Sequence, residues 1–388
     1  MGHGRFNEVK VHTRIAEMSG PLFPPFHRRK MVVIRRRAPY TQAVVELNLS
    51  LAKDPLTRPV LFEQLRYALI SVGFLYISNH GVPEKVINDL VNVLPELFDL
   101  PESAKEEIAL RNSPHFLGYS SVGSETTGGK ADKREQAEFA TELLAVESKD
   151  APLYERLRGP NQLPPLRPAV TSYIQELTAL GERFLRLVAE ALSLPQETFF
   201  HFLSDQHRLK LVHYPGASNS PSSGTITQGV GPHKDSSGWW TFLLQASPPE
   251  IKGLQALNKN GDWIDVPVIP GTFVVNIGQA FEVVTNGVCK ATTHRVLMSG
   301  YKDRYSVPFF QGVRRNLTKT EAVETLKEHF SRFAAGGESV EAKDIDSTFL
   351  RGKYDTWGES QLRTKIRSHR DVGKKFYGDV FDKYVNDD

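Results

Sequence analysis

The feature that most constrains this chain is a set of two histidines and one aspartate. His233 and Asp235 stand two residues apart in Gly-Pro-His-Lys-Asp, and His294 follows much later in Ala-Thr-Thr-His-Arg-Val. Because side chains two apart on a β-strand point to the same face, His233 and Asp235 can reach one ion from a single strand end. His294 can join them only in a fold that brings distant strands together. Two imidazoles and one carboxylate, with open positions opposite them, are the ligand set of a non-haem Fe(II) centre.

The surrounding pattern matters because a lone His-x-Asp is weak evidence, and a histidine and an aspartate near a surface turn would explain it as well. Short β-like runs separated by Gly and Pro turns fill this half of the chain. Asn260-Gly261-Asp262 is a hairpin turn signal. Regular short strands of this kind predict a sandwich or jelly roll. The runs are residues 209–214, 239–245, 253–257, 263–266, 272–277, 293–298 and 305–310.

Helical periodicity dominates on both sides of this β-rich part. Apolar residues recur at helical spacing over residues 59–72, 85–98 and 170–192, and helix returns over 318–333 and between Gln361 and Lys383. The Gly-rich stretch 116–133 is a loop able to cover a site; a phosphate cradle is disfavoured because no strand or Gly-x-Gly-x-x-Gly frames it. The expected divisions are an N-terminal helix and strand region (41–168), a β core with its preceding long helix (169–316) and a C-terminal helical extension (317–388).

Residues 1–40 differ from the rest in being rich in arginine and lysine and poor in acids. Pro21, Pro24 and Pro25 break any long helix. We expect a disordered basic tail; a transit peptide, or a true start at Met31, is the alternative. Over the whole chain, 48 basic and 45 acidic residues give a net charge of +3, so no nucleic-acid partner is expected.

Cysteine usage bears on the cellular compartment. Cys289 is the only cysteine, so no disulfide within the chain can form, and we expect a reducing compartment. No apolar run reaches the ~18 residues of a membrane helix. We expect a cytoplasmic monomer that acts on a small molecule and contacts no membrane.

Several stretches together resemble a known family. They are residues 73–82 (Gly-Phe-Leu-Tyr-Ile-Ser-Asn-His-Gly-Val), 231–235, 253–255 (Gly-Leu-Gln), 261–278, 285–287 (Thr-Asn-Gly) and 291–296. In this order they resemble the Fe(II)/2-oxoglutarate-dependent oxygenases of the isopenicillin N synthase-like family, fungal or bacterial type. The resemblance implies a mainly β fold with flanking α-helices: a double-stranded β-helix, or jelly roll, of the cupin-like, clavaminate synthase-like kind.

The resemblance also implies roles for further residues. In this family an arginine and a serine two apart bind 2-oxoglutarate; here they are Arg304 and Ser306, and the guanidinium would form a bidentate pair with the distal carboxylate. Tyr214 matches a tyrosine that contacts the co-substrate, and Asn276 a position near the iron. Phe310 shares a strand face with Arg304 by parity, so we expect it to line the substrate pocket, with plain core as the alternative.

The chain departs from the family pattern at two places. Many members carry Arg and Asn in the strand before the Tyr-Pro pair, where this chain has Lys210 and Val212, so a hydrogen bond from that Asn to the co-substrate is lost. The segment from Asp235 to Thr241 is one residue longer than in plant members. Trp239 and Trp240 can therefore not be assigned from sequence as inward or outward.

The activity that the resemblance implies uses Fe(II), 2-oxoglutarate and O2 as cofactors. 2-Oxoglutarate is decarboxylated to succinate and CO2 while a small organic substrate is oxidised, which we expect to be a hydroxylation rather than desaturation or ring closure. Two alternatives remain open. One is a same-fold oxidase that uses no 2-oxoglutarate, such as isopenicillin N synthase or aminocyclopropane carboxylate oxidase. The other is a non-catalytic regulatory member, whose usual sign is a lost metal ligand.

Overall fold

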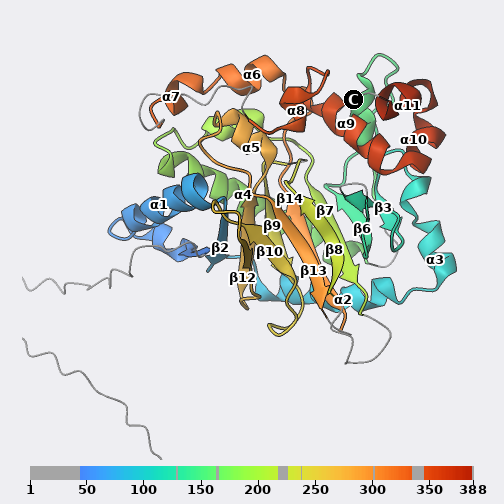
Figure 1. Ribbon diagram of the computed structural model, residues 1–388, viewed down its shortest axis with the longest axis horizontal. Coiled ribbons are helices and arrows are strands. Elements are labelled where there is room, and N and C mark those ends of the chain that lie inside the picture. Colours follow the sequence, from blue (N-terminus) through green and yellow to red (C-terminus); the bar gives the residue numbers. More distant parts are fainter. Residues whose placement is uncertain are drawn as a thin grey trace, which may run out of the picture. The chain divides into compact units, whose positions relative to one another are not determined.

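A computed structural model describes residues 44–127, 130–162, 166–216, 226–236, 238–299, 302–333 and 345–386 (Figure 1). Residues 42–388 form one compact unit. The expected tail, residues 1–40, lies outside the described residues. The expected divisions near residues 168 and 316 remain predictions, and strands from both sides of residue 168 share one sheet, since β2 (Phe74–Ser78) pairs with β12 (Thr272–Ile277).

A large mixed sheet forms the body of the molecule. Its strand order is β1-β2-β12-β9-β14-β7-β6-β3. Every residue of β12 is buried, as expected for a central strand rich in Val, Ile and Phe. The remaining strands are β1 (Val45–Asn48), β9 (Trp240–Gln245), β14 (Arg304–Phe310), β7 (Arg208–Tyr214), β6 (Glu135–Ala140) and β3 (Gly118–Ser120).

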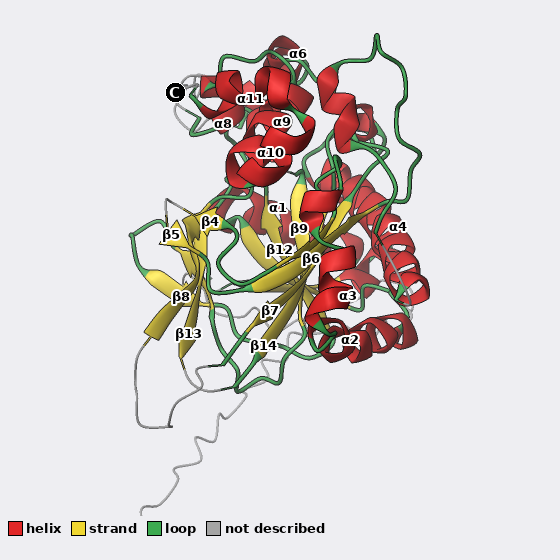
Figure 2. Cartoon of the chain, turned by 90° about the vertical axis from the view of Figure 1, so that its right-hand side faces the viewer, coloured by secondary structure: helices red, strands yellow, loops and turns green. Residues whose placement is uncertain are grey.

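A smaller antiparallel sheet packs against the large one (Figure 2). Its order is β11 (Trp263–Asp265), β10 (Leu254–Leu257), β13 (His294–Ser299) and β8 (Ile226–His233). Apolar side chains of both sheets form one core cluster between them: Phe74, Tyr76, Val212, Tyr214, Val230, Leu254, Ala256, Val266, Val274, Val296 and Met298. The expected double-stranded β-helix is therefore confirmed. The hairpin at Asn260-Gly261-Asp262 is confirmed as well, with Gly261 at a φ of +86° between β10 and β11.

Helices cover the outer face of the large sheet. The longest, α4 (Arg167–Ala191), lies against it with α1 (Arg58–Tyr67) and α2 (Glu84–Phe98). Trp239 and Trp240 both point into this helix-facing core and are at most 1% exposed. Their rings contact aromatic side chains of the helical layer, and the Trp240 ring lies 5.0 Å from that of Phe184 on α4. The sequence left the direction of Trp239 and Trp240 open, and both lie on the outer face of the large sheet, away from the space between the sheets.

The C-terminal helices close one end of the two sheets, where Figure 2 shows α9 (Trp357–Ser368) and α10 (Arg370–Phe376) above the strands and near the β4–β5 hairpin (Thr126–Thr127 and Lys130–Ala131). The helix expected over 318–333 is two short ones, because it ends at Glu324 and restarts at Lys327. The other helices are α3 (Glu102–Glu107), α5 (Gln279–Val284), α6 (Lys319–Glu324), α7 (Lys327–Ser331), α8 (Thr348–Arg351) and α11 (Gly378–Val385). None of the helices in the described segments has the length and apolar character needed to cross a membrane.

Candidate active site

The register of the small sheet brings the three candidate metal ligands together. His294 on β13 lies directly opposite His233 at the end of β8. Asp235 follows His233 by two residues, and its Oδ1 lies 3.6 Å from Nε2 of His233 and 3.5 Å from Nε2 of His294. One ligand atom from each of the three lies within 4.8 Å of the others. The distant histidine therefore arrives through strand pairing.

Hydrogen bonds leave one atom of each ligand free. Nδ1 of His233 lies 2.8 Å from the Gly231 carbonyl, and Nδ1 of His294 lies 3.0 Å from that of Thr292, so each Nδ1–H donates and each Nε2 keeps its lone pair. Oδ2 of Asp235 accepts from Thr241 Oγ1 at 2.5 Å and from Asn276 Nδ2 at 2.6 Å. The remaining Nε2, Nε2 and Oδ1 atoms face one another, which is the donor set that Fe(II) takes.

The charges at this site suit a cation. Burial alone would raise the pKa of Asp235, but His294 and His233 hold it well below its usual range. Burial and the neighbouring His294 lower the pKa of His233. For His294, burial is outweighed by Asp235, so its pKa is raised. Metal binding requires ionised Asp235 and neutral imidazoles, so it must displace any proton held by His294.

The three ligands open into a cavity of about 370 Å³. Arg304, Ser306, Pro308 and Phe310, which share one face of β14, line it together with Tyr214 of β7. Phe310 thus lies on the cavity wall, and its contact with the substrate remains a prediction. The sequence placed Asn276 near the metal, and the structure locates it as a donor to Asp235.

Arg304 is the most deeply buried cation of this wall, at 1% exposed. Its Nη2 donates to Gln245 at 3.3 Å, and its Cζ lies 4.9 Å from the Tyr214 ring centre, but its Nη1 has no hydrogen-bond partner in the described segments. Burial lowers the pKa of Arg304 from its usual value and outweighs the opposite influence of the neighbouring Tyr214. An unpaired buried guanidinium nitrogen costs free energy, so this geometry fits a bound carboxylate, with the Ser306 hydroxyl two residues along the same face.

A second part of the cavity wall, formed by the start of β7, by β6 and by α9, lies further along the strands from Arg304, and we call it the opposite wall. It carries charges that the sequence did not single out as functional. Glu125, Arg134, Glu138, Arg208, Lys210, Lys365 and His369 all line the cavity there. A signal did exist in the even spacing of charged residues. Arg134 and Glu138 are four apart at and within one strand-like run, and Arg208 and Lys210 are two apart in the neighbouring strand. What sequence could not supply is Lys365 on α9.

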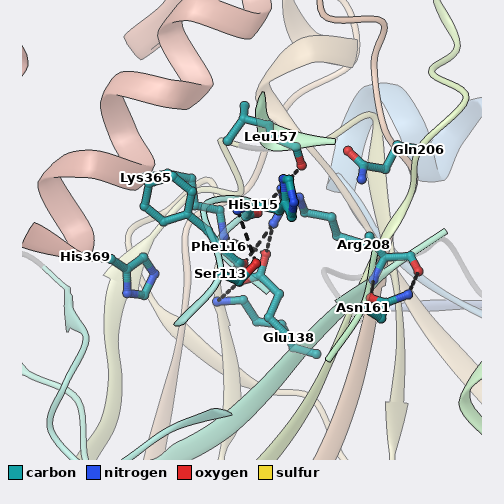
Figure 3. Close-up of polar contacts among 12 residues, drawn as sticks. Ser113, His115, Phe116, Glu138, Leu157, Asn161, Gln206, Arg208, Lys365 and His369 are labelled. Atoms are coloured by element: carbon teal, nitrogen blue, oxygen red, sulfur yellow. Dashed lines mark hydrogen bonds and ion pairs between the residues drawn. The ribbon is translucent and has the colours of Figure 1, made fainter. Parts of the chain in front are cut away.

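Helix α9 presents one face to the cavity. Gln361, Thr364, Lys365 and Ser368 recur at helical spacing and line it, whereas Leu362 and Ile366 on the other side pack in a separate apolar cluster. Thr356 caps the helix, because its side-chain oxygen accepts from the Glu359 amide. Lys365 is thereby held over Glu138, to which it donates at 2.6 and 2.7 Å (Figure 3).

Two family models match this chain. Residues 44–166 match the N-terminal region of the non-haem dioxygenases in morphine synthesis, and residues 206–313 match the 2OG-Fe(II) oxygenase superfamily. The chain belongs to the 2OG-Fe(II) oxygenase superfamily. It is an Fe(II)- and 2-oxoglutarate-dependent dioxygenase, an oxidoreductase that uses iron, 2-oxoglutarate and O2.

Relatives of this oxygenase include characterised enzymes and solved structures. The 2-oxoglutarate-dependent dioxygenase frbJ of Dothideomycetidae sp. (strain 11243) is 41% identical over 342 residues, covering 85% of this chain and 90% of that protein. A homoarginine-6-hydroxylase of Glycine max is 30% identical over 314 residues, covering 79% and 91%. A full-length Neurospora crassa protein, solved with α-ketoglutarate, has a TM-score of 0.62 at 21% identity, covering 83% and 95%, and shares the fold.

Proposed function

We propose that His233, Asp235 and His294 hold the Fe(II) of this dioxygenase, and that Arg304 holds the distal carboxylate of 2-oxoglutarate. The observation that carries this is the pairing of two features in one cavity: three convergent free ligand atoms and an unpartnered buried guanidinium nitrogen. Ser306 and Tyr214, on the same wall, are proposed to complete the co-substrate site. The departure at Val212 leaves an apolar surface between them, so no side-chain hydrogen bond is offered at that point.

The bound iron and co-substrate would supply oxidation by O2, coupled to conversion of 2-oxoglutarate to succinate and CO2. The chain's own residues prepare that site. Thr241 and Asn276 fix Asp235 so that one carboxylate oxygen faces the metal. Leu243, Leu254 and Val296 line the same space and exclude water, which strengthens the charge pairing of a bound carboxylate.

We propose that the reaction is hydroxylation of a small organic substrate, with Phe310 forming part of the substrate wall and Asn276 acting through Asp235. The cavity of about 370 Å³ lies near the lower end of the ~300–1,000 Å³ typical of small-molecule sites, and it must hold the co-substrate as well. The homoarginine-6-hydroxylase relative is named for hydroxylation of a small amino acid, which supports the same class here.

An anaerobic Fe(II) titration with and without 2-oxoglutarate tests the site. A metal-to-ligand charge-transfer band should form only when both are present and the triad is intact. Succinate release under O2 then separates this reaction from an oxidase that uses no 2-oxoglutarate. A non-catalytic regulatory member would give no succinate with any substrate; the presence of all three ligands speaks against it.

Monomeric action in the cytoplasm, without nucleic-acid or membrane partners, is also part of the proposal. Its supports are modest ones: a near-balanced charge of +3 and a single cysteine, Cys289, that is completely buried. Size-exclusion chromatography with light scattering and imaging of a tagged full-length chain would test the two points separately.

A further inference from the structure

The opposite wall holds more cations than anions. Four basic side chains line it: Arg134, Arg208, Lys210 and Lys365. Among the described residues, only Glu125 and Glu138 line it as carboxylates apart from the metal ligand Asp235. Asp132 lies behind the wall, 3.1 Å from Arg134, and still leaves positive charge in excess. A surplus of buried positive charge is costly unless a ligand supplies the counter-charge.

Both carboxylates of this wall already have close partners other than Lys210. Glu138 lies 2.6 Å from Arg208 Nη1 and 2.6 Å from Lys365 Nζ. Glu125 lies 2.8 Å from Arg134 Nη2 and 3.1 Å from His369 Nε2. The positive charges around the two carboxylates, Lys210 included, lower the pKa of each glutamate despite its burial, which alone would raise it.

Arg208 is fully engaged as well. Besides Glu138, its guanidinium donates to three backbone carbonyls, those of His115, Phe116 and Leu157, at 3.0–3.3 Å (Figure 3). Arg208 therefore connects the cavity wall to the loops behind it. These partners within the protein account for its burial without a bound ligand.

Lys210 is the loosely held cation. Its Nζ lies 3.3 and 3.4 Å from the two oxygens of Glu125 and 3.7 Å from Glu138, well beyond the ~2.7–2.9 Å of a close charge-assisted pair. Its side chain is 15% exposed, and it lines the cavity. Lys210 is thus the wall cation that a ligand can recruit at least cost to the existing pairs.

Lys210 is also separate from the co-substrate clamp. It shares the inward face of β7 with Tyr214, four residues further on, which lies against Arg304. At about 3.3 Å per residue, the two positions are roughly 13 Å apart along the strand. An anion held by Lys210 would therefore be a different group from the carboxylate held by Arg304.

We propose that the substrate of this oxygenase carries a carboxylate and that Lys210 binds it, which rests on the proposed function of the metal and co-substrate site. The carboxylate supplies the missing negative charge of the wall and replaces long contacts to Glu125 by a close pair. Lys210 is then a specificity-determining residue: it selects substrates with an anionic end and fixes that end away from Arg304.

Paired probes test this. The full chain, loaded with Fe(II) and 2-oxoglutarate without O2, is titrated with phenylacetate against phenylacetamide, hexanoate against hexanamide, and L-homoarginine against L-homoargininamide. Binding is followed by the shift in melting temperature, and succinate release under O2 by a separate assay. At least one acid should bind about tenfold or more tightly than its amide, the scale of one charge-assisted hydrogen bond.

Three variants sharpen the result. Lys210→Met should bring the acid's affinity down to that of the amide and leave the amide's unchanged, whereas Lys210→Arg should keep the preference for the acid. Both glutamates retain two close cationic partners in Lys210→Met, so the variant should fold. Lys85→Met removes an exposed lysine with a single ion pair and is the matched control.

Failure of this inference is distinguishable from failure of the proposed function. If the 2-oxoglutarate charge-transfer band does not form in the unmodified protein, the proposed function is wrong. If the band forms but no acid binds better than its amide, including the case where no probe binds, the carboxylate assignment is overturned. It is also overturned if Lys210→Met behaves like Lys85→Met, or if Lys210→Met itself loses the band.

Discussion

The two ends of the cavity hold their charges in opposite ways. At the metal end, hydrogen bonds occupy Nδ1 of each histidine and Oδ2 of Asp235, and the remaining Nε2 and Oδ1 atoms face one another. Arg304 nearby likewise keeps Nη1 unpartnered. At the opposite wall, Glu138 is 1% exposed and held by close ion pairs with Arg208 and Lys365, so these three charges are matched within the protein, whereas Lys210 is held by longer contacts.

This difference separates groups prepared for ligands from groups that hold the wall together. A side chain that is buried, oriented and left with an unused atom is stabilised only when a ligand arrives. A side chain that is buried and fully paired is costly to disturb but gains little from a ligand. Changes at the metal end should therefore remove function and spare the fold, whereas changes to the closely paired Glu138, Arg208 and Lys365 should lower stability and spare iron binding.

The largest effect is expected at the ligands themselves. His233→Ala, Asp235→Ala or His294→Ala should each abolish turnover, because two remaining donors hold Fe(II) poorly. The fold should survive, because none of the three side chains is a member of an apolar core cluster. Iron content and succinate release measure the loss, and circular dichroism checks the fold. A variant that kept full activity would not have lost a ligand.

The opposite wall should respond through stability. Glu138→Gln leaves Arg208 and Lys365 without their shared counter-charge, and loss of one partner of a buried ion pair costs roughly 3–5 kcal/mol. Chemical unfolding should show this decrease in the free energy of unfolding, with iron affinity nearly unchanged. Glu46→Gln, at an exposed position of β1, is the control and should change stability by less than about 0.5 kcal/mol. Equal stability of the two variants would contradict the comparison.

How well each end could be predicted from sequence follows the same division. The metal end depends on local spacing: His233 and Asp235 are two apart on a strand end, and Arg304 and Ser306 are two apart on another. The opposite wall joins Glu125, Glu138, Lys210 and Lys365 from segments far apart in the chain, and their pairing depends on how α9 sits on the sheets. Trp239 and Trp240 show the same limit, because the one-residue extension before them removes the parity that would place them.

Arg304→Leu should weaken 2-oxoglutarate much more than iron. A lost charge pair at a buried carboxylate costs about 2–5 kcal/mol, or roughly 30- to several thousand-fold in affinity. Charge-transfer titrations give both constants. Arg295→Leu on β13 is the control, because Arg295 hydrogen-bonds Gln255 and stacks on Trp263 outside the cavity lining. A change of less than about threefold in the 2-oxoglutarate constant of Arg304→Leu would remove Arg304 from the clamp.

A smaller effect is expected where a side chain acts only through a ligand. Asn276→Ala and Thr241→Val each remove one hydrogen bond to Oδ2 of Asp235 and should cost about 10–100-fold in iron affinity. The 2-oxoglutarate constant, measured at saturating iron, should stay within a factor of about three. Larger losses in the co-substrate constant than in the iron constant would show that these residues serve the Arg304 side of the cavity instead.

The smallest effect is expected from removing residues 1–40, which should leave iron and 2-oxoglutarate binding unchanged. Among the described residues, the cavity lining begins at Glu125, and the compact unit begins at Gln42. Both ends of the cavity should therefore respond alike, with no loss of the charge-transfer band and no fall in melting temperature. Imaging of the full-length and truncated chains tests in parallel whether the basic segment determines location. If truncation lowered the melting temperature while sparing the band, residues 1–40 would support the wall and not the metal end; loss of the band would place them at the site.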